Sequence, residues 1–287
     1  MSEPRLGHAD RYRSGSWIER SVGRLRRGGR SAAPPALRRA FEAVLDHLPG
    51  DRLVSVLPEG ERIRLSARYR HVSWNPDEYR AFRAAVRPGT TVLDIGANVG
   101  AYTLVFATWV GEHGRVFAFE PAPDACEGLR AHVALNGFED RVTIVEAAVS
   151  GSAGHAPFAI HPSGGASSLA LGSVANATQI CVPTDTIDGV CKAYGLLPAV
   201  IKIDVEGAEL DVLKGAPNVL ALPGLAVFVE FHPAAWRSAG ITRAEVEQEL
   251  DRQGFVVEPL DPAFDPWTTE GVCVRLRRRS GRPRSGR

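Results

Sequence analysis

From residue 90 onward the chain alternates short apolar runs with helical patterns, and this alternation constrains the fold more than any other feature. The rhythm is typical of βαβ units, in which crossover helices join parallel strands. It predicts an α/β fold with a doubly wound, mostly parallel sheet. The predicted strands are Thr91–Ile95, Arg115–Phe119, Val142–Val145, Val200–Asp204, Ala226–Phe231 and Val272–Leu276, and the predicted helices are Ala101–Val110, Pro123–Leu135, Ala208–Leu213 and Thr242–Gln253.

The residues before 90 predict a flexible tail and a small cap. Residues 28–35 combine glycine, proline and small side chains, so they read as a linker that ends a basic flexible tail, 1–35. Residues 36–89 predict a cap of helix, β-hairpin and helix, with the hairpin turn at Pro58-Glu59-Gly60 and the second helix at Pro76–Val86. The main domain is expected over 90–278, and a second basic tail over 279–287. The Gly/Ser-rich passage 150–190 is too long for an ordinary connection, so we expect extra strands and a mobile loop in it.

Charge is distributed unevenly along the chain. The net charge is +5 for residues 1–30 and +7 for residues 275–287, and because the whole chain carries +1, residues 31–274 carry −11. Two basic tails therefore flank an acidic body. Such tails can attract nucleic acid or anionic membrane, but they lack interleaved aromatic residues. We expect them to be solvated ends, with nucleic acid an unlikely partner.

Two further features of the sequence concern membrane or signal segments and the cysteines. No apolar run reaches eighteen residues, and the N-terminus lacks the pattern of a signal peptide, so a cytoplasmic protein without a transmembrane segment is expected. The four cysteines are widely spaced and include no C-x-x-C pair, so they suggest neither a zinc site nor a disulfide framework. Nothing in the sequence indicates the oligomeric state.

A glycine loop follows the first predicted strand of the main domain. Gly96 and Gly100 allow the backbone to turn sharply and approach a ligand at the carboxyl edge of the sheet. The dinucleotide fingerprint G-x-G-x-x-G would need glycine where Asn98 stands. Asp94 at the strand end would repel a pyrophosphate and attract an ammonium group. Glu120 ends the next strand, at the position from which a carboxylate accepts ribose hydroxyls. The loop and Glu120 thus indicate a nucleoside cofactor with a cationic portion.

At these motifs the sequence resembles the FkbM family of class I methyltransferases. The matching segments occur in family order: DIGANVGAYT at 94–103, AFEP at 118–121, LNG at 135–137, AAVS at 147–150, TID at 186–188, IKIDVEGAE at 201–209 and VEFH at 229–232. The resemblance implies a Rossmann-like fold for 90–278, an S-adenosylmethionine cofactor and O-methylation of a hydroxyl group. His132 departs from the asparagine that the family commonly shows.

Two sets of site residues follow from this interpretation. We expect the glycine loop to hold the methionine portion, Glu120 the ribose, and residues 146–148 the adenine side. The predicted cofactor-binding residues are Asp94, Gly96, Asn98, Gly100, Tyr102, Thr103, Glu120, Glu146 and Ala148, and the predicted acceptor-facing residues are Asp204, Glu206, Glu230 and His232. Lys202, inside a core strand, is expected to pair with one of these carboxylates rather than to act as a base.

Several alternatives remain open at this point. Either His232 or Asp204 takes the proton from the acceptor hydroxyl, or the carboxylates hold a divalent cation that lowers the pKa of the hydroxyl, or the cluster only positions the acceptor. An NAD-dependent oxidoreductase would use the same sheet, and a non-catalytic binding protein would use the tails. The expected partner is a small-molecule or glycan hydroxyl acceptor, whose identity the sequence does not reveal.

Overall fold

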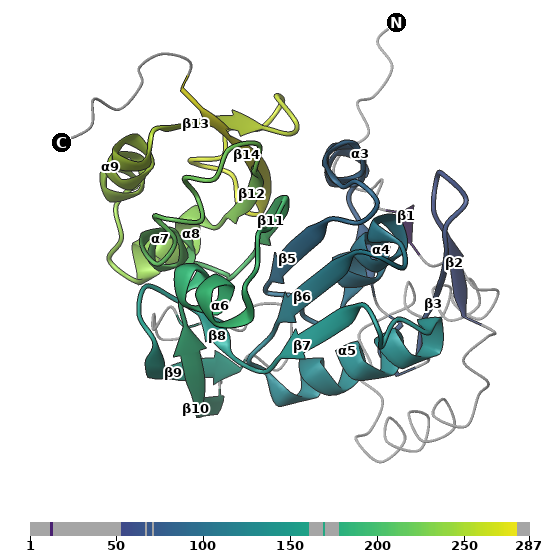
Figure 1. The fold of residues 1–287 in the computed structure, drawn as a ribbon. Coiled ribbons are helices and arrows are strands. Elements are labelled where there is room, and N and C mark those ends of the chain that lie inside the picture. The colour runs from purple at the N-terminus through teal and green to yellow at the C-terminus, as the bar shows by residue number, and fades with distance from the viewer. Residues whose placement is uncertain are drawn as a thin grey trace, which may run out of the picture.

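The computed structural model describes residues 12–13, 53–66, 68–70, 72–160, 169 and 178–279. The predicted linker, the first helix of the cap, the predicted mobile loop and most of both tails lie outside these residues. Figure 1 shows a twisted central sheet with helices on both sides. The expectation of a doubly wound, Rossmann-like sheet is confirmed.

The central sheet has seven strands in the order β13-β14-β12-β11-β5-β6-β7. Five neighbouring strands run parallel, and β14 is antiparallel to both β12 and β13. The strands are β5 (Thr91–Ile95), β6 (Arg115–Phe119), β7 (Val142–Val145), β11 (Val200–Ile203), β12 (Ala226–Phe231), β13 (Phe255–Pro259) and β14 (Val272–Arg278).

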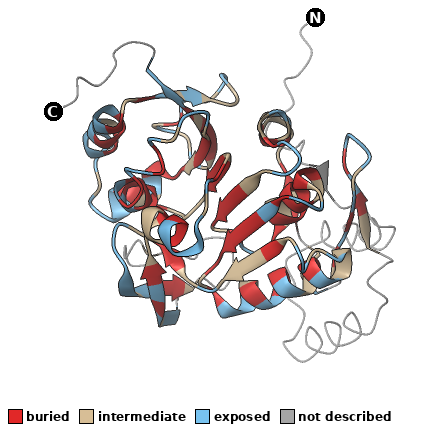
Figure 2. Ribbon diagram, in the orientation of Figure 1, coloured by how far each residue is buried: buried red, intermediate tan, exposed pale blue. Residues whose placement is uncertain are grey.

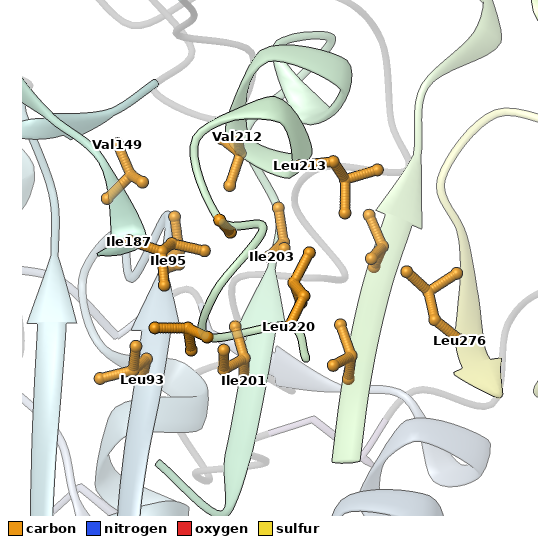
Figure 3. Packing of buried hydrophobic residues seen from close by; sticks show 14 of the residues in the cluster. Leu93, Ile95, Val149, Ile187, Ile201, Ile203, Val212, Leu213, Leu220 and Leu276 are labelled. Carbon is orange, nitrogen blue, oxygen red and sulfur yellow. The ribbon is translucent and has the colours of Figure 1, made fainter. Parts of the chain in front are cut away.

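Alternation along the strands divides the apolar core between the two faces of the sheet. Leu93 and Ile201 pack on the face covered by α6 (Ile187–Tyr194), α7 (Glu209–Lys214) and α9 (Arg243–Gln253), and Figure 3 shows part of this packing. Val92 and Phe228 pack on the opposite face, which is covered by α3 (Pro76–Ala85), α4 (Ala101–Val110) and α5 (Pro123–Asn136). The strands are mostly buried in Figure 2, as a parallel sheet covered on both faces requires.

The described part of the N-terminal segment packs onto the second of these faces. The predicted hairpin forms as β2 (Val54–Val56) and β3 (Arg62–Arg64), and the predicted helix forms as α3. The short strand β4 (Ser73–Trp74), which pairs with β1 (Tyr12–Arg13), leads into α3. Trp74 Nε1 donates to the carbonyl of Ala101 at 2.9 Å, and the backbone NH of Asn75 donates to the Tyr102 hydroxyl at 3.1 Å. The segment is therefore bonded to the first turn of α4, directly after the glycine loop.

The passage 150–190 contains extra strands, as predicted. Strand β9 (Gly154–Ile160) pairs with β10 (Thr178–Asp185), which also pairs with β8 (Ala148–Val149). The sequence interpretation missed α6, α8 (Pro233–Ser238) and β13. Among the described residues, we find no helix with the length and apolarity that a membrane crossing requires.

Candidate active site

The glycine loop is held against the end of the neighbouring strand. Gly96 has φ +78°, and a β-carbon on it would overlap the backbone carbonyl oxygen of Asp204. Asn98 has a left-handed φ of 51°, which asparagine tolerates better than most residues. Gly100, with φ +91°, is the residue at which α4 begins. The backbone of the loop therefore lies closer to Asp204 than any residue with a side chain at position 96 would allow.

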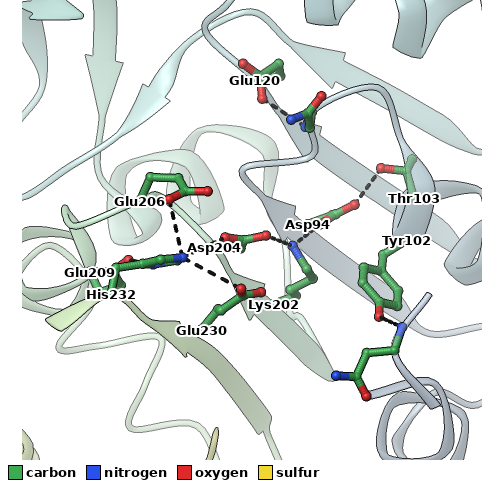
Figure 4. Close-up of polar contacts among 12 residues, drawn as sticks. Asp94, Tyr102, Thr103, Glu120, Lys202, Asp204, Glu206, Glu209, Glu230 and His232 are labelled. Carbon is green, nitrogen blue, oxygen red and sulfur yellow. Dashed lines mark hydrogen bonds and ion pairs between the residues drawn. The ribbon is translucent and has the colours of Figure 1, made fainter. Parts of the chain in front are cut away.

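Asp94 and Lys202 form a buried charged pair beneath this loop (Figure 4). Asp94 Oδ2 accepts a 2.5 Å hydrogen bond from the Thr103 hydroxyl, whereas Oδ1 accepts none and lies 3.5 Å from Lys202 Nζ. Lys202 Nζ also donates to Asp204 Oδ2 at 3.2 Å. Burial alone would lower the pKa of Lys202, but the carboxylates of Asp204 and Asp94 more than offset burial and raise it. Lys202 is thus a fixed cation, in agreement with its predicted role as a partner of carboxylates.

Glu120 is a buried carboxyl at the end of β6. Its two oxygens accept hydrogen bonds from the backbone NH groups of Asn98, at 2.9 Å, and Ala122, at 2.8 Å. Burial raises the pKa of Glu120 to about 7, against the lowering effect of these two bonds. The carboxyl is therefore fixed in position and retains lone pairs for further donors.

A cavity of about 580 Å³, including its open mouth, runs along this edge of the sheet. Glu120 stands on its wall, Asp204 and Glu206 contribute carboxylates, and apolar side chains line the space between. The lining residues are Ile95, Gly96, Asn98, Phe119, Glu120, Pro121, Ala147, Ala148, Val149, Phe158, Leu169, Asp204, Val205, Glu206 and Ala208.

Some predicted cofactor residues are not among those that line this cavity. Glu146 is exposed and forms an ion pair with Arg130. Thr103 is buried against Asp94, and the Tyr102 ring packs against Phe82 with a centroid separation of 5.0 Å. These side chains support the elements around the cavity, whereas Gly96, Asn98, Glu120 and Ala148 line it.

The four predicted acceptor-facing residues converge at the ends of β11 and β12. His232 Nε2 lies 3.4 Å from Glu206 Oε2, 3.7 Å from Glu230 Oε1 and 3.9 Å from Asp204 Oδ1. Figure 4 shows the imidazole directed between Glu206 and Glu230. The prediction that the two strands are neighbours is confirmed. We call Asp204, Glu206, Glu230 and His232 the acidic cluster.

Glu209 is a further residue of this site that the sequence interpretation did not select. It is fully buried at the start of α7, and its Oε1 lies 2.7 Å from His232 Nδ1 and accepts from the NH of Gly207 at 2.9 Å. Its Oε2 accepts from Trp236 Nε1 at 2.5 Å. The signal available in the sequence was its place in the matching segment 201–209. Glu209 fixes the orientation of the imidazole in the acidic cluster.

Electrostatics assign different protonation states to members of the cluster. Burial would lower the pKa of His232, but hydrogen bonds to Glu209 and Glu230 outweigh burial and raise its pKa well above the ordinary value. The imidazole therefore keeps its proton at neutral pH. Burial raises the pKa of Glu206 to about 7, although the positive His232 opposes the shift. Burial and the neighbouring Asp204 raise the pKa of Glu230 as well.

Glu78 on α3 is a second acidic residue that the sequence did not point out. It is buried beside Tyr102, to which it is hydrogen bonded, and Glu230, Lys202 and Asp204 are close enough to influence its ionisation. Burial, followed by the charge of Glu230, raises the pKa of Glu78 to about 8. The N-terminal segment thus contributes a protonated carboxyl next to the acidic cluster at neutral pH.

Glu78→Gln is expected to make stability less dependent on pH. Because the folded-state pKa of Glu78 exceeds its unfolded value of about 4.5, the folded protein binds the extra proton and loses stability as pH rises from about 4.5 to 8. Glutamine keeps the shape of the glutamate side chain but has no titratable group. Thermal unfolding at pH 5 and pH 8 measures the difference, and the variant should gain on the wild type at pH 8. An equal decline in both proteins would contradict the shift.

Three members of the acidic cluster also have a spacing that one metal ion would require. Ligand atoms of Asp204, Glu230 and His232 lie within 4.8 Å of one another. However, Lys202 and the protonated His232 already supply positive charge at this point. A divalent cation would have to displace the proton of His232 before binding it.

Comparison with known proteins agrees with this geometry. The family model described as Methyltransferase FkbM domain matches residues 94–257, which include the glycine loop, Glu120 and the acidic cluster. Methyltransferase sdnD of Sordaria araneosa is 28% identical over 194 residues, which cover 57% of this chain and 73% of that protein. Hexuronic acid methyltransferase AglP of Haloferax volcanii is 29% identical over 194 residues, which cover 67% of this chain and 74% of that protein.

Among solved structures, the FkbM methyltransferase of Methylobacillus flagellatus is 18% identical. The match covers 69% of this chain and 50% of that chain with a TM-score of 0.42. The matched family model spans more than half of the chain. The chain therefore belongs to the FkbM methyltransferase family.

Proposed function

We propose that this protein transfers the methyl group of S-adenosylmethionine to a hydroxyl oxygen of a small molecule or sugar. The observation that carries the proposal is a single cavity whose wall joins a ribose-type acceptor, Glu120, to the carboxylates Asp204 and Glu206. The relation to a hexuronic acid methyltransferase supports a sugar-like acceptor. S-adenosylmethionine, when bound, supplies a methyl group that its positive sulfur makes strongly electrophilic.

The residues that line the cavity, together with the buried Asp94 beneath the glycine loop, fit this cofactor. Asp94 has a buried oxygen that accepts no hydrogen bond, and Gly96 leaves room that a β-carbon would fill. Glu120 would accept the ribose hydroxyls, and the apolar walls at Phe119 and Val149 suit a purine ring. The Gly96–Gly100 loop would hold the methionine portion.

In the acidic cluster, Glu206 is the group best suited to accept the proton of the reacting hydroxyl. It lines the cavity, and a pKa of about 7 leaves it available as a base at neutral pH. His232 is already protonated, so in this proposal it orients Glu206 and Glu230 instead of acting as the base. Asp204, held by Lys202 at 3.2 Å, would position the acceptor.

Above pH 7, where Glu120 is ionised, Glu120→Ala is expected to weaken S-adenosylmethionine binding by about 1.5–3 kcal/mol, because the ribose would lose hydrogen bonds to a charged group. Titration calorimetry measures the change in Kd, and circular dichroism checks that the fold persists. An unchanged Kd would contradict the assignment of Glu120.

The same calorimetric experiment separates the proposed cofactor from NAD. Asn98 in place of a glycine, together with Asp94 and Asp204 beside the loop, disfavours a pyrophosphate. We therefore expect binding of S-adenosylmethionine and none of NAD at equal concentration. The opposite preference would favour an oxidoreductase.

A chelator is expected to leave the methylation rate unchanged, because Lys202 and His232 already compensate the carboxylates that a metal would use. The measurement is the initial rate with EDTA and after addition of Mg²⁺. A rate that collapses with EDTA and returns with Mg²⁺ would establish the metal-assisted alternative.

A further inference from the structure

At the acidic cluster, the negatively charged side chains are more exposed than the positively charged side chains of His232 and the neighbouring Lys202. The carboxylate side chains are partly accessible, with exposed fractions of 26% for Asp204, 31% for Glu206 and 23% for Glu230. The cations behind them are shielded, with 4% for His232 and 5% for Lys202. Asp204 and Glu206 line the cavity, so an entering molecule meets their oxygens, and the positive groups lie beneath them.

Both cations also lie against protein carboxylates. Lys202 Nζ lies between Asp204 at 3.2 Å and Asp94 at 3.5 Å. His232 directs Nδ1 to Glu209 at 2.7 Å and Nε2 toward Glu206 at 3.4 Å. Within the described ranges, these are the cations that form ion pairs with the cluster, and the shielding of their side chains keeps an anionic ligand from reaching either of them.

We propose that the acceptor is an uncharged, hydroxyl-rich molecule and that the site excludes acceptors with a carboxylate or phosphate next to the reacting hydroxyl. This inference rests on the proposed function and specifies its substrate class. Sugar hydroxyls donate well to exposed carboxylates, whereas above pH 7 an anion at the same place would face the charges of Asp204 and Glu206 without an accessible cation. The related AglP is named as a hexuronic acid methyltransferase, so this chain would differ from it in the charge of the acceptor.

The test uses S-adenosylmethionine labelled in its methyl group and three shape-matched probes at equal concentration. These are neutral hexosides, the corresponding hexuronides and the methyl esters of those hexuronides. Products are separated by anion exchange and identified by mass spectrometry. We expect kcat/KM for the neutral hexosides and the esters to exceed that for the free acids by at least about 100-fold. Equal or better methylation of a free acid would overturn the inference.

A charge variant tests the cause of the selectivity. Asp204→Asn removes one negative charge from the cavity wall and should lower the preference for neutral acceptors over acids by about tenfold, whatever its absolute rate. Glu258→Gln is the matched control, because Glu258 lies on β13, outside the cluster, and pairs with Arg277 on β14. A preference that Asp204→Asn leaves intact would overturn the electrostatic explanation.

Failure of the proposed function has a different signature. If the protein binds S-adenosylmethionine in calorimetry but labels none of the three probes, methylation of sugar-like hydroxyls is contradicted, and the inference falls with it. Label in the acid fraction would instead leave the methyltransferase proposal standing and overturn the charge selectivity alone.

Discussion

Gly96→Ala is expected to abolish S-adenosylmethionine binding and to lower the free energy of unfolding by at least about 3 kcal/mol more than a matched glycine substitution. A β-carbon at this position would overlap the carbonyl oxygen of Asp204, and a backbone atom of a core strand end cannot move aside cheaply. The positive φ of +78° adds a smaller strain, about 1–2 kcal/mol. Urea unfolding gives the stability, and calorimetry gives the affinity.

The control for this prediction is Gly137→Ala. Gly137 ends α5 with a similar φ of +68°, but a β-carbon there would meet no atom within 4 Å. The control therefore isolates the conformational cost from the steric overlap. If the two variants are equally stable and both bind the cofactor, the close approach of the loop to Asp204 is not required.

Glu206→Gln is expected to reduce the methylation rate by about 10²–10⁴-fold, the usual contribution of a positioned base. Only the deprotonated carboxylate can accept a proton. With a pKa of about 7, the wild-type rate should therefore rise with pH, reach half its maximum at about pH 7 and level off above about pH 8. Glutamine should remove this rise. The measurement is kcat/KM between pH 5 and 9.

Two comparisons make the Glu206 result decisive. Glu258→Gln, outside the acidic cluster, should retain the wild-type profile. His232→Ala should also slow the reaction, because Glu206 loses its orienting partner at 3.4 Å, but the rise of rate with pH should persist. A Glu206→Gln enzyme that keeps both the rate and the pH dependence would require another base, and Asp204 would be the next candidate.

Most of the fold was predictable because the spacing of apolar residues along the chain indicates where the strands and helices lie. The strand bounds at Thr91–Ile95 and Ala226–Phe231 agree residue for residue, since buried parallel strands consist almost entirely of apolar side chains. The convergence of the acidic cluster followed from the same pattern, because neighbouring parallel strands bring their carboxyl ends to one edge. Elements in which the apolar residues recur less regularly, such as α8, were not predicted.

The rest of the site depends on contacts between residues far apart in the chain. Glu209 acquires its role from His232 and Trp236, and a helical glutamate gives no local sign of complete burial. Glu78 acquires its role from α3 packing against α4, which brings it to Tyr102. Glu146 and Ala148 were both predicted to bind the cofactor. In the tertiary fold Ala148 lines the cavity, whereas the side chain of Glu146 is exposed.

The position of β14 has a consequence for the order in which the protein is synthesised. β13 is synthesised before β14. Among the described strands, β13 pairs with β14. β14 also pairs with β12 and covers its free edge. Until residues 272–278 leave the ribosome, the edge of β12 is exposed next to the unpaired β13. An unprotected edge of this kind is a template for aggregation. The nascent chain should therefore depend most on chaperones in the interval after β13 has emerged and before β14 has, when the glycine loop and the acidic cluster are already outside the ribosome.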